Sequence, residues 1–123
     1  NLEELRLKYK AVVLCPWQLP KLSGEFDLFG NFISFQEMEP SVVANYAKVI
    51  QPLVKKYVLL RNSAHGKPVA KKSGKLGVIE PVTADFINKQ FDEFSVLGKD
   101  SLVFGDESTD RQFRSEVTVL QRT

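Results

Sequence analysis

The chain has 123 residues, of which 43% are hydrophobic and 26% are charged, and its formal net charge at pH 7 is +2. This is the composition of one soluble globular domain, and the chain is too short for two. Positive and negative residues are nearly balanced, without the excess of basic residues that nucleic-acid binders usually carry. No apolar run approaches the roughly 20 residues of a membrane span. We therefore expect neither nucleic acid nor a membrane as a partner.

The N-terminal region predicts a helix end followed by a strand. The chain starts at Asn1 without a methionine, and residues 1–10 resemble the end of a charged helix, so we expect 1–123 to be one domain that forms the C-terminal part of a longer one. Next, "KAVVLC", Lys10–Cys15, is an apolar run stopped by Pro16 and predicts a buried strand. Cys15 is the single cysteine, which is typical of a protein in the reducing cytoplasm.

The middle of the chain predicts a strand–helix–strand unit. Phe26–Phe35 is strongly apolar and predicts a second strand. From Pro40 the apolar residues recur every three or four positions, which predicts a helix that ends or kinks at Pro52. Lys56–Asn62 predicts a third buried strand, and the helix before it is the natural crossover between two parallel strands.

The last third predicts a loop, a helix and a hairpin. Ser63–Pro81 is rich in Gly, Lys and Pro and predicts a long loop, and a helix is predicted from Thr83 to about Phe94. The strands Ser101–Phe104 and Phe113–Leu120 are joined by a connection too short for a crossover helix, so they should pair antiparallel.

Alternation in the final strand predicts that Val117 and Val119 face the core and that Glu116 and Thr118 face away. The whole pattern predicts an α/β fold with mostly parallel strands, flanking helices and a terminal antiparallel hairpin. This is the arrangement of the C-terminal half of a Rossmann-like methyltransferase sheet.

Three stretches carry a family resemblance: "VVLCPWQLPKL", "FDLFGNFISFQEMEPSVVANY" and "YVLLRNSAHGK". They resemble the C-terminal half of a bacterial family of sugar O-methyltransferases, over roughly Val12–Lys67, and "SFQEM" followed by a proline and "VVANY" is the most specific part. The resemblance implies a parent protein that uses S-adenosylmethionine to methylate a sugar hydroxyl. The glycine turn and the acidic residue that bind this cofactor in the family are absent here, so we expect weak binding or none by this chain alone.

Ligands of open α/β sheets bind beyond the carboxyl ends of the strands, and the candidate site residues lie at such positions or near them. The candidates for catalysis are Glu37, Gln36 and His65; those for cofactor binding are Asn31, Phe32 and Trp17; those for substrate binding are Ser34, Arg61 and Asn62. No metal site is predicted, because the chain has one histidine and one cysteine.

Each of these residues also has a structural interpretation. Glu37 can be a general base for a sugar hydroxyl, or a carboxylate that stabilises the start of the next helix through its dipole. Gln36 and Ser34 can satisfy backbone groups at a strand end. Trp17 can line a pocket or pack on the core, and His65 can be an ordinary exposed loop residue.

The stretch "GKPVAKKSGK", Gly66–Lys75, does not have the spacing of a phosphate-binding loop, and it predicts a solvated basic loop that can touch an anionic sugar. Two functions remain open at this point. One is part of a methyltransferase that acts on a sugar or glycan, and the other is a non-catalytic α/β binding or interaction domain without the cofactor half. A sheet of half the usual size also predicts self-association or pairing with the missing N-terminal half.

Overall fold

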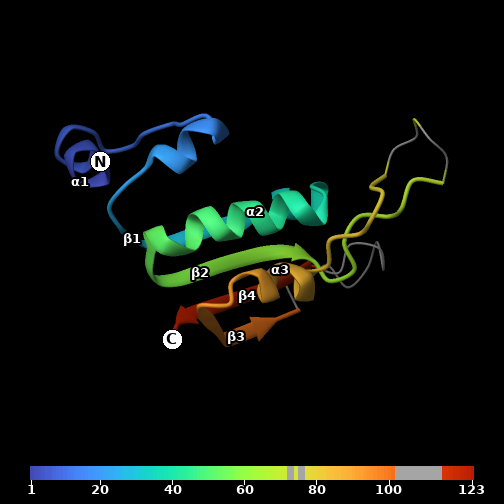
Figure 1. The fold of residues 1–123 in the computed structure, drawn as a ribbon. Coiled ribbons are helices and arrows are strands. Elements are labelled where there is room, and N and C mark those ends of the chain that lie inside the picture. The colour runs from blue at the N-terminus through green and yellow to red at the C-terminus, as the bar shows by residue number, and fades with distance from the viewer. Residues whose placement is uncertain (72–73, 75–76, 102–114) are drawn as a thin grey trace.

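The computed structural model describes residues 1–71, 74, 77–101 and 115–123. Its regular elements follow one another along the chain as Figure 1 shows. The helices are α1 (Leu2–Lys8), α2 (Pro40–Ile50) and α3 (Ala84–Gln90), and the strands are β1 (Phe26–Phe32), β2 (Val54–Ser63), β3 (Phe94–Asp100) and β4 (Ser115–Arg122). Short 3-10 helices occur at η1 (Pro16–Lys21), η2 (Ser34–Glu37) and η3 (Gln51–Leu53).

The four strands form one sheet in the order β1-β2-β4-β3. β1 and β2 are parallel and are connected through α2, which confirms the predicted crossover unit. β4 is antiparallel to both β2 and β3, so β3 runs in the same direction as β1 and β2. Three of the four strands therefore run in the same direction, and the reversed strand β4 lies between β2 and the edge strand β3, so only β1 and β2 are parallel neighbours. This confirms the predicted α/β fold class.

Helix α2 starts and ends where the sequence predicts. Pro40 occupies the first turn, where a missing N–H costs no hydrogen bond, and the helix ends at Ile50 before η3, which contains Pro52. Val43 and Ala47 are fully buried, and with Ile50 they form one face with the four-residue and three-residue spacing of a helix. This face packs on the sheet and holds α2 over β1 and β2.

Both α2 and α3 pack on the same face of the sheet. Val43 of α2 and Ile87 of α3 join Val58 of β2 and Leu120 of β4 in one buried core. Side chains alternate along strands, so Tyr57 and its register partner Leu28 point to the opposite face. Both are exposed. The sheet thus has one covered face and one face with exposed apolar side chains.

The predicted strand Lys10–Cys15 is wrong. The segment after α1 has no regular structure up to η1, and Val13 is 97% exposed. A run of β-prone residues forms a strand only where another strand offers hydrogen-bond partners, and none of the described strands lies beside this segment. The helix predicted at residues 1–10 is present as α1.

The C-terminal hairpin is antiparallel as predicted, but its first strand lies earlier in the chain. Helix α3 ends at Gln90 rather than near Phe94, and β3 covers Phe94–Asp100 and pairs with β4. Most of the predicted strand Ser101–Phe104 lies outside the described residues. Gly98 and Lys99 interrupt the apolar pattern of β3, which explains why its sequence does not stand out as a strand.

The predicted orientation of β4 is also wrong. Glu116 and Thr118 are 7% and 1% exposed on the covered face, together with Leu120, whereas Val117 and Val119 are only half-buried on the other face. The two-residue alternation is present, but hydrophobicity does not select the face. Leu120 fixes it, because it belongs to the core under the helices, and residues two and four positions earlier must share its side.

The described part of the long loop Ser63–Pro81 consists of turns and bends, as predicted, with one isolated bridge between Val69 and Val78. Within the described residues, none of the helices has the length and apolar character needed to cross a membrane.

Candidate functional site at the carboxyl edge of the sheet

A tight turn follows the end of β1 and is built by Asn31. The Asn31 side chain donates from Nδ2 to Ser34 Oγ at 2.6 Å and accepts at Oδ1 from the backbone N–H of Phe35 at 3.3 Å. Ile33 has a φ of 70°, a left-handed conformation that is unusual for a β-branched residue. The amide of Asn31 is therefore occupied in shaping the turn into η2.

Gln36 connects this turn to the end of β2. Its Oε1 accepts a hydrogen bond of 2.5 Å from the backbone N–H of Ser63, and both residues are buried. Ser63 is the last residue of β2, so its N–H needs an acceptor at the point where the ladder ends. The amide that follows β1 therefore serves at least a structural purpose. Its predicted catalytic role stays a prediction.

Glu37 lies at the same edge, and it forms an ion pair with Lys67 from the loop after β2. Both side chains are partly exposed. The next carboxylate, Glu39, accepts at Oε1 from the backbone N–H of Ile79 at 3.3 Å. The long loop is thus tied at two positions to the segment that leads into α2, through Glu37 and Glu39.

Arg61 and Asn62 lie near the end of β2, but their side chains point to opposite faces. Asn62 shares the covered face with Leu60 and is 2% exposed. Arg61 lies beside Phe32 of β1 on the other face, and its carbonyl accepts from the N–H of Ile33 at 2.6 Å. The structure therefore brings all the predicted strand-end residues to one edge but does not bring these two side chains together.

The sequence analysis missed a charged residue beside Asn62, Glu116, and the lysine that contacts it, Lys99. Glu116 of β4 is the register partner of Asn62, and Glu116 Oε2 accepts from Lys99 Nζ at 2.8 Å. Lys99 Nζ is also 3.4 Å from Asp85 Oδ1 of α3. The hydrogen bond to Glu116 raises the pKa of Lys99 above its ordinary 10.5, and Asp85 acts in the same direction. The strand register is the signal that could have found this cluster.

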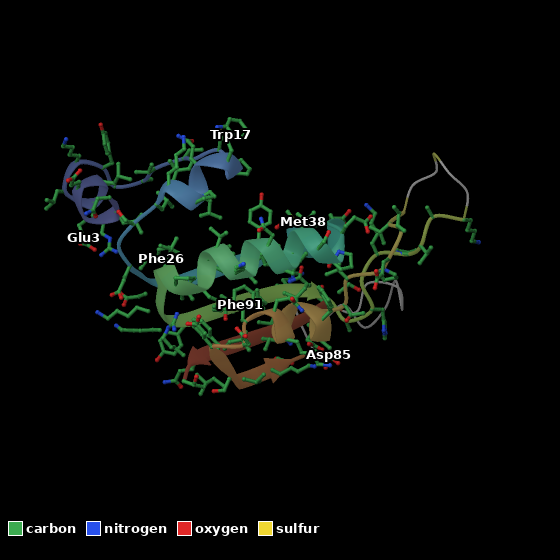
Figure 2. The ribbon with its side chains drawn as sticks, in the orientation of Figure 1. Glu3, Trp17, Phe26, Met38, Asp85 and Phe91 are labelled. Carbon is green, nitrogen blue, oxygen red and sulfur yellow. The ribbon has the colours of Figure 1, made fainter. Side chains whose placement is uncertain are left out.

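Trp17 and His65 stand apart from the strand ends. Trp17 is 73% exposed in η1, which packs on α2, and Figure 2 shows it on the side of α2 away from the sheet, whereas Asp85 lies beside the sheet. His65 is exposed in the turn after β2. Phe32, by contrast, is 56% exposed on β1 and offers an apolar surface near the strand end.

A shallow hollow lies at the opposite, amino edge of the sheet. Its lining comes from α1 and from the starts of β1 and β2, namely Glu3, Arg6, Glu25, Phe26, Asp27 and Lys55. Its charges are largely matched, since Glu3 pairs with Arg6 and Glu25 with Lys55. The hollow contains none of the predicted site residues.

Comparison with known proteins bears on the fold. No protein-family model matches the sequence, and no curated protein sequence matches it significantly. Solved structures do match. The magnesium protoporphyrin IX methyltransferase ChlM of Synechocystis PCC 6803 superimposes with TM-scores of 0.57 in its structures with bound SAM and with bound SAH, at 14% and 13% identity. A S-adenosylmethionine-dependent methyltransferase of Clostridium acetobutylicum ATCC 824 gives a TM-score of 0.60 at 9% identity.

The matches cover most of this chain but only part of the ChlM chains. The two ChlM matches each cover 85% of this chain, and they cover 43% and 48% of the ChlM chains. The match to the Clostridium protein covers 98% of this chain and 69% of that protein. Identities this low show a shared fold and not a shared substrate. The four-stranded sheet with its helices thus has the same fold as part of these Rossmann-like structures.

Proposed function

We propose that the chain is part of a S-adenosylmethionine-dependent methyltransferase that acts on a sugar hydroxyl. The fold shared with such methyltransferases carries the proposal. The sugar comes from the sequence resemblance around "SFQEM", and the acceptor would bind at the carboxyl edge, where Ser34, Arg61 and Asn62 lie. A cytoplasmic location belongs to the proposal and is supported by the lone, exposed Cys15.

The residues present fit one side of a cofactor site. Phe32 and Ile33 are exposed at the end of β1, and their apolar surfaces suit the adenine or the methionine chain of S-adenosylmethionine. Asn31 holds the turn that presents them. Trp17 would take part only if η1 moved toward this edge. When bound, S-adenosylmethionine supplies an electrophilic methyl group.

The protein's contribution to the chemistry is alignment and proton removal. Groups at the carboxyl edge would orient the acceptor hydroxyl beside the cofactor site, so that the two reactants meet in a fixed orientation. Glu37, once separated from Lys67, would accept the proton that the acceptor hydroxyl gives up. Gln36 contributes by fixing η2, on which Glu37 stands.

The uncovered face and edge of the sheet also suggest a partner. Leu28, Phe32 and Tyr57 expose apolar surface on the face without α2 and α3, and β1 is an edge strand. Surfaces of this kind are usually covered in stable proteins. We propose that the remaining half of the methyltransferase fold covers them in the parent protein, and that the isolated chain self-associates through them.

Two observations test the function. The residues encoded before Asn1 should contain a strand followed by Gly-x-Gly, whereas a start codon close to Asn1 would favour the non-catalytic binding domain. The protein that includes those residues should then transfer labelled methyl groups from S-adenosylmethionine to a monosaccharide. Glu37→Gln should lower kcat by about 10²–10⁴-fold, and the matched change Glu25→Gln at the amino edge should leave it unchanged. Absence of transfer to any sugar would contradict the proposal.

A further inference from the structure

Two buried polar side chains lie opposite each other on β2 and β4, and the one on β4 has no role in the chemistry described above. Asn62 and Glu116 are register partners, and both point to the covered face, where they are 2% and 7% exposed. Directly opposite side chains on neighbouring strands have Cβ atoms about 5 Å apart. An amide and a carboxylate therefore lie side by side inside the protein.

Three atoms of this pair lack hydrogen-bond partners among the described residues. They are Oδ1 and Nδ2 of Asn62 and Oε1 of Glu116, and all three are shielded from solvent. Native proteins satisfy most buried polar atoms, because a buried donor or acceptor without a partner costs free energy. Three such atoms in adjacent side chains form one set of buried donors and acceptors that can bind a polar group.

The surroundings fix the charge and the orientation of the carboxylate. Lys99 Nζ donates to Glu116 Oε2 at 2.8 Å and so neutralises the charge on one side, which leaves Oε1 as the free acceptor. Asp85 holds Lys99 from α3 at 3.4 Å. Asn62 is followed by Ser63, whose N–H is bound by Gln36, so the pair lies at the same sheet edge as the proposed acceptor site.

The unsatisfied atoms determine which kind of polar group can bind between Asn62 and Glu116. Asn62 Nδ2 requires an acceptor, whereas Asn62 Oδ1 and Glu116 Oε1 require donors. An ammonium group would leave Nδ2 without a partner, and a carboxylate would be repelled by Glu116. A neutral hydroxyl group both donates and accepts, and two hydroxyl groups on adjacent carbons satisfy all three atoms.

We infer that Asn62 and Glu116 form a hydroxyl-binding site that holds a sugar through hydroxyl groups next to the one that is methylated. This inference rests on the proposed function for the identity of the ligand, and on the unsatisfied atoms for its chemistry. Entry requires local movement, and the turn after Asn62 can yield, because Gly66 N donates to Ser63 O at 3.3 Å and Ser63 Oγ to Gly66 O at 3.5 Å, both long hydrogen bonds.

The test is a nuclear magnetic resonance titration of the 15N-labelled chain with the methyl glycosides of glucose, mannose and galactose. The reporter is the side-chain NH₂ signal of Asn62, which is assigned from its disappearance in Asn62→Leu. This variant should stay folded, because leucine removes the unsatisfied amide at similar size. We expect a saturable shift with at least one glycoside, at a dissociation constant in the millimolar range.

Matched variants separate this site from general effects. Glu116→Gln should weaken glycoside binding at least about tenfold, because a charged acceptor is lost. Glu93→Gln changes a glutamate that lies just before β3 and pairs with Arg122 at the far end of β4, and it should leave the shift unaltered. If Glu116→Gln does not fold, Lys99→Met, which removes the cation beside Oε2, should also change the affinity.

Three results would overturn the inference: no shift with any glycoside, an equal shift with 1,4-dioxane, which has no hydroxyl group, or a contact of the Asn62 amide with a bound water only. Failure of the proposed function is a separate result. If the longer protein transfers no methyl group but glycosides bind at Asn62, the proposed methyltransferase function is wrong and the hydroxyl-binding site is supported. If the longer protein transfers methyl groups and Glu116→Gln does not change the transfer, the hydroxyl-binding site is wrong and the methyltransferase function is supported.

Discussion

Gln36 offers a direct test of how the carboxyl edge is held together. Gln36→Leu removes the Oε1 atom that accepts the N–H of Ser63 at 2.5 Å, while the leucine fills a similar volume. Gln36 and Ser63 are both buried, so the N–H loses its acceptor without gaining water. A buried group left without a partner costs about 1–3 kcal/mol.

Urea denaturation measures this cost. With a slope of roughly 2 kcal/mol per molar urea, the midpoint should fall by roughly 0.5–1.5 M at an unchanged slope. The amide proton of Ser63 should also lose its protection from hydrogen exchange in the variant. The neighbouring change Glu37→Gln is the control, because it removes only a partly exposed ion pair with Lys67, which is worth about 0–1 kcal/mol.

A free energy of unfolding of Gln36→Leu within about 0.5 kcal/mol of the wild-type value, together with a Ser63 amide that keeps its protection, would contradict this role of Gln36. In that case the end of β2 would be satisfied in another way, and Gln36 would be free for a role toward a ligand.

Three further variants test other features of the structure. Gly66→Ala should destabilise the chain by at least about 1–2 kcal/mol in a thermal or urea transition, because φ is +72° and a Cβ would lie 2.5 Å from the carbonyl oxygen of Val82. Ile33→Gly should stabilise the chain by roughly 0.5–1 kcal/mol in the same assay, because glycine relieves about 1–2 kcal/mol of left-handed backbone strain, which exceeds its entropy cost. A less stable variant would contradict the φ of 70° at Ile33. Lys99 has a folded-state pKa above 10.5, so its contribution to stability is complete below pH 10.5 and is lost as pH rises through the folded value. When the pH is raised from about 9 to about 12, the urea midpoint of Lys99→Met should therefore fall less than that of the wild type. Equal falls in the two midpoints would contradict the contact between Lys99 and Glu116.

The crossover unit was predictable because its signals are local. Pro40 and Pro52 delimit α2, and the apolar spacing between them belongs to a helix whatever the rest of the chain does. The strands on either side follow from apolar runs that end at polar residues. The same local signals placed Gln36 and Asn62 at strand ends, and the structure places both at one edge.

The errors occur where a partner decides the structure. Lys10–Cys15 has the composition of a strand and lies beside none of the described strands, so it stays irregular. The face of β4 depends on which side of the sheet α3 covers, and neither Val117 nor Glu116 carries that information. For the same reason the pairing of Glu116 with Asn62 and Lys99 was missed, because it arises from the register of β2 and β3 with β4.

The most direct measurement of the central claim is a calorimetric titration of S-adenosylmethionine into the 123-residue chain, with the oligomeric state followed by light scattering. Under the proposed function this chain contributes one wall of the cofactor site, through the exposed side chains of Phe32 and Ile33. One wall buries far less than the 70–90% of ligand surface that is usual in complete sites. A loss of about 3 kcal/mol of contacts weakens binding by about two decades. We predict no binding in the micromolar range and a chain that self-associates. Micromolar binding to a monomer would contradict the claim that this chain forms only part of the methyltransferase site.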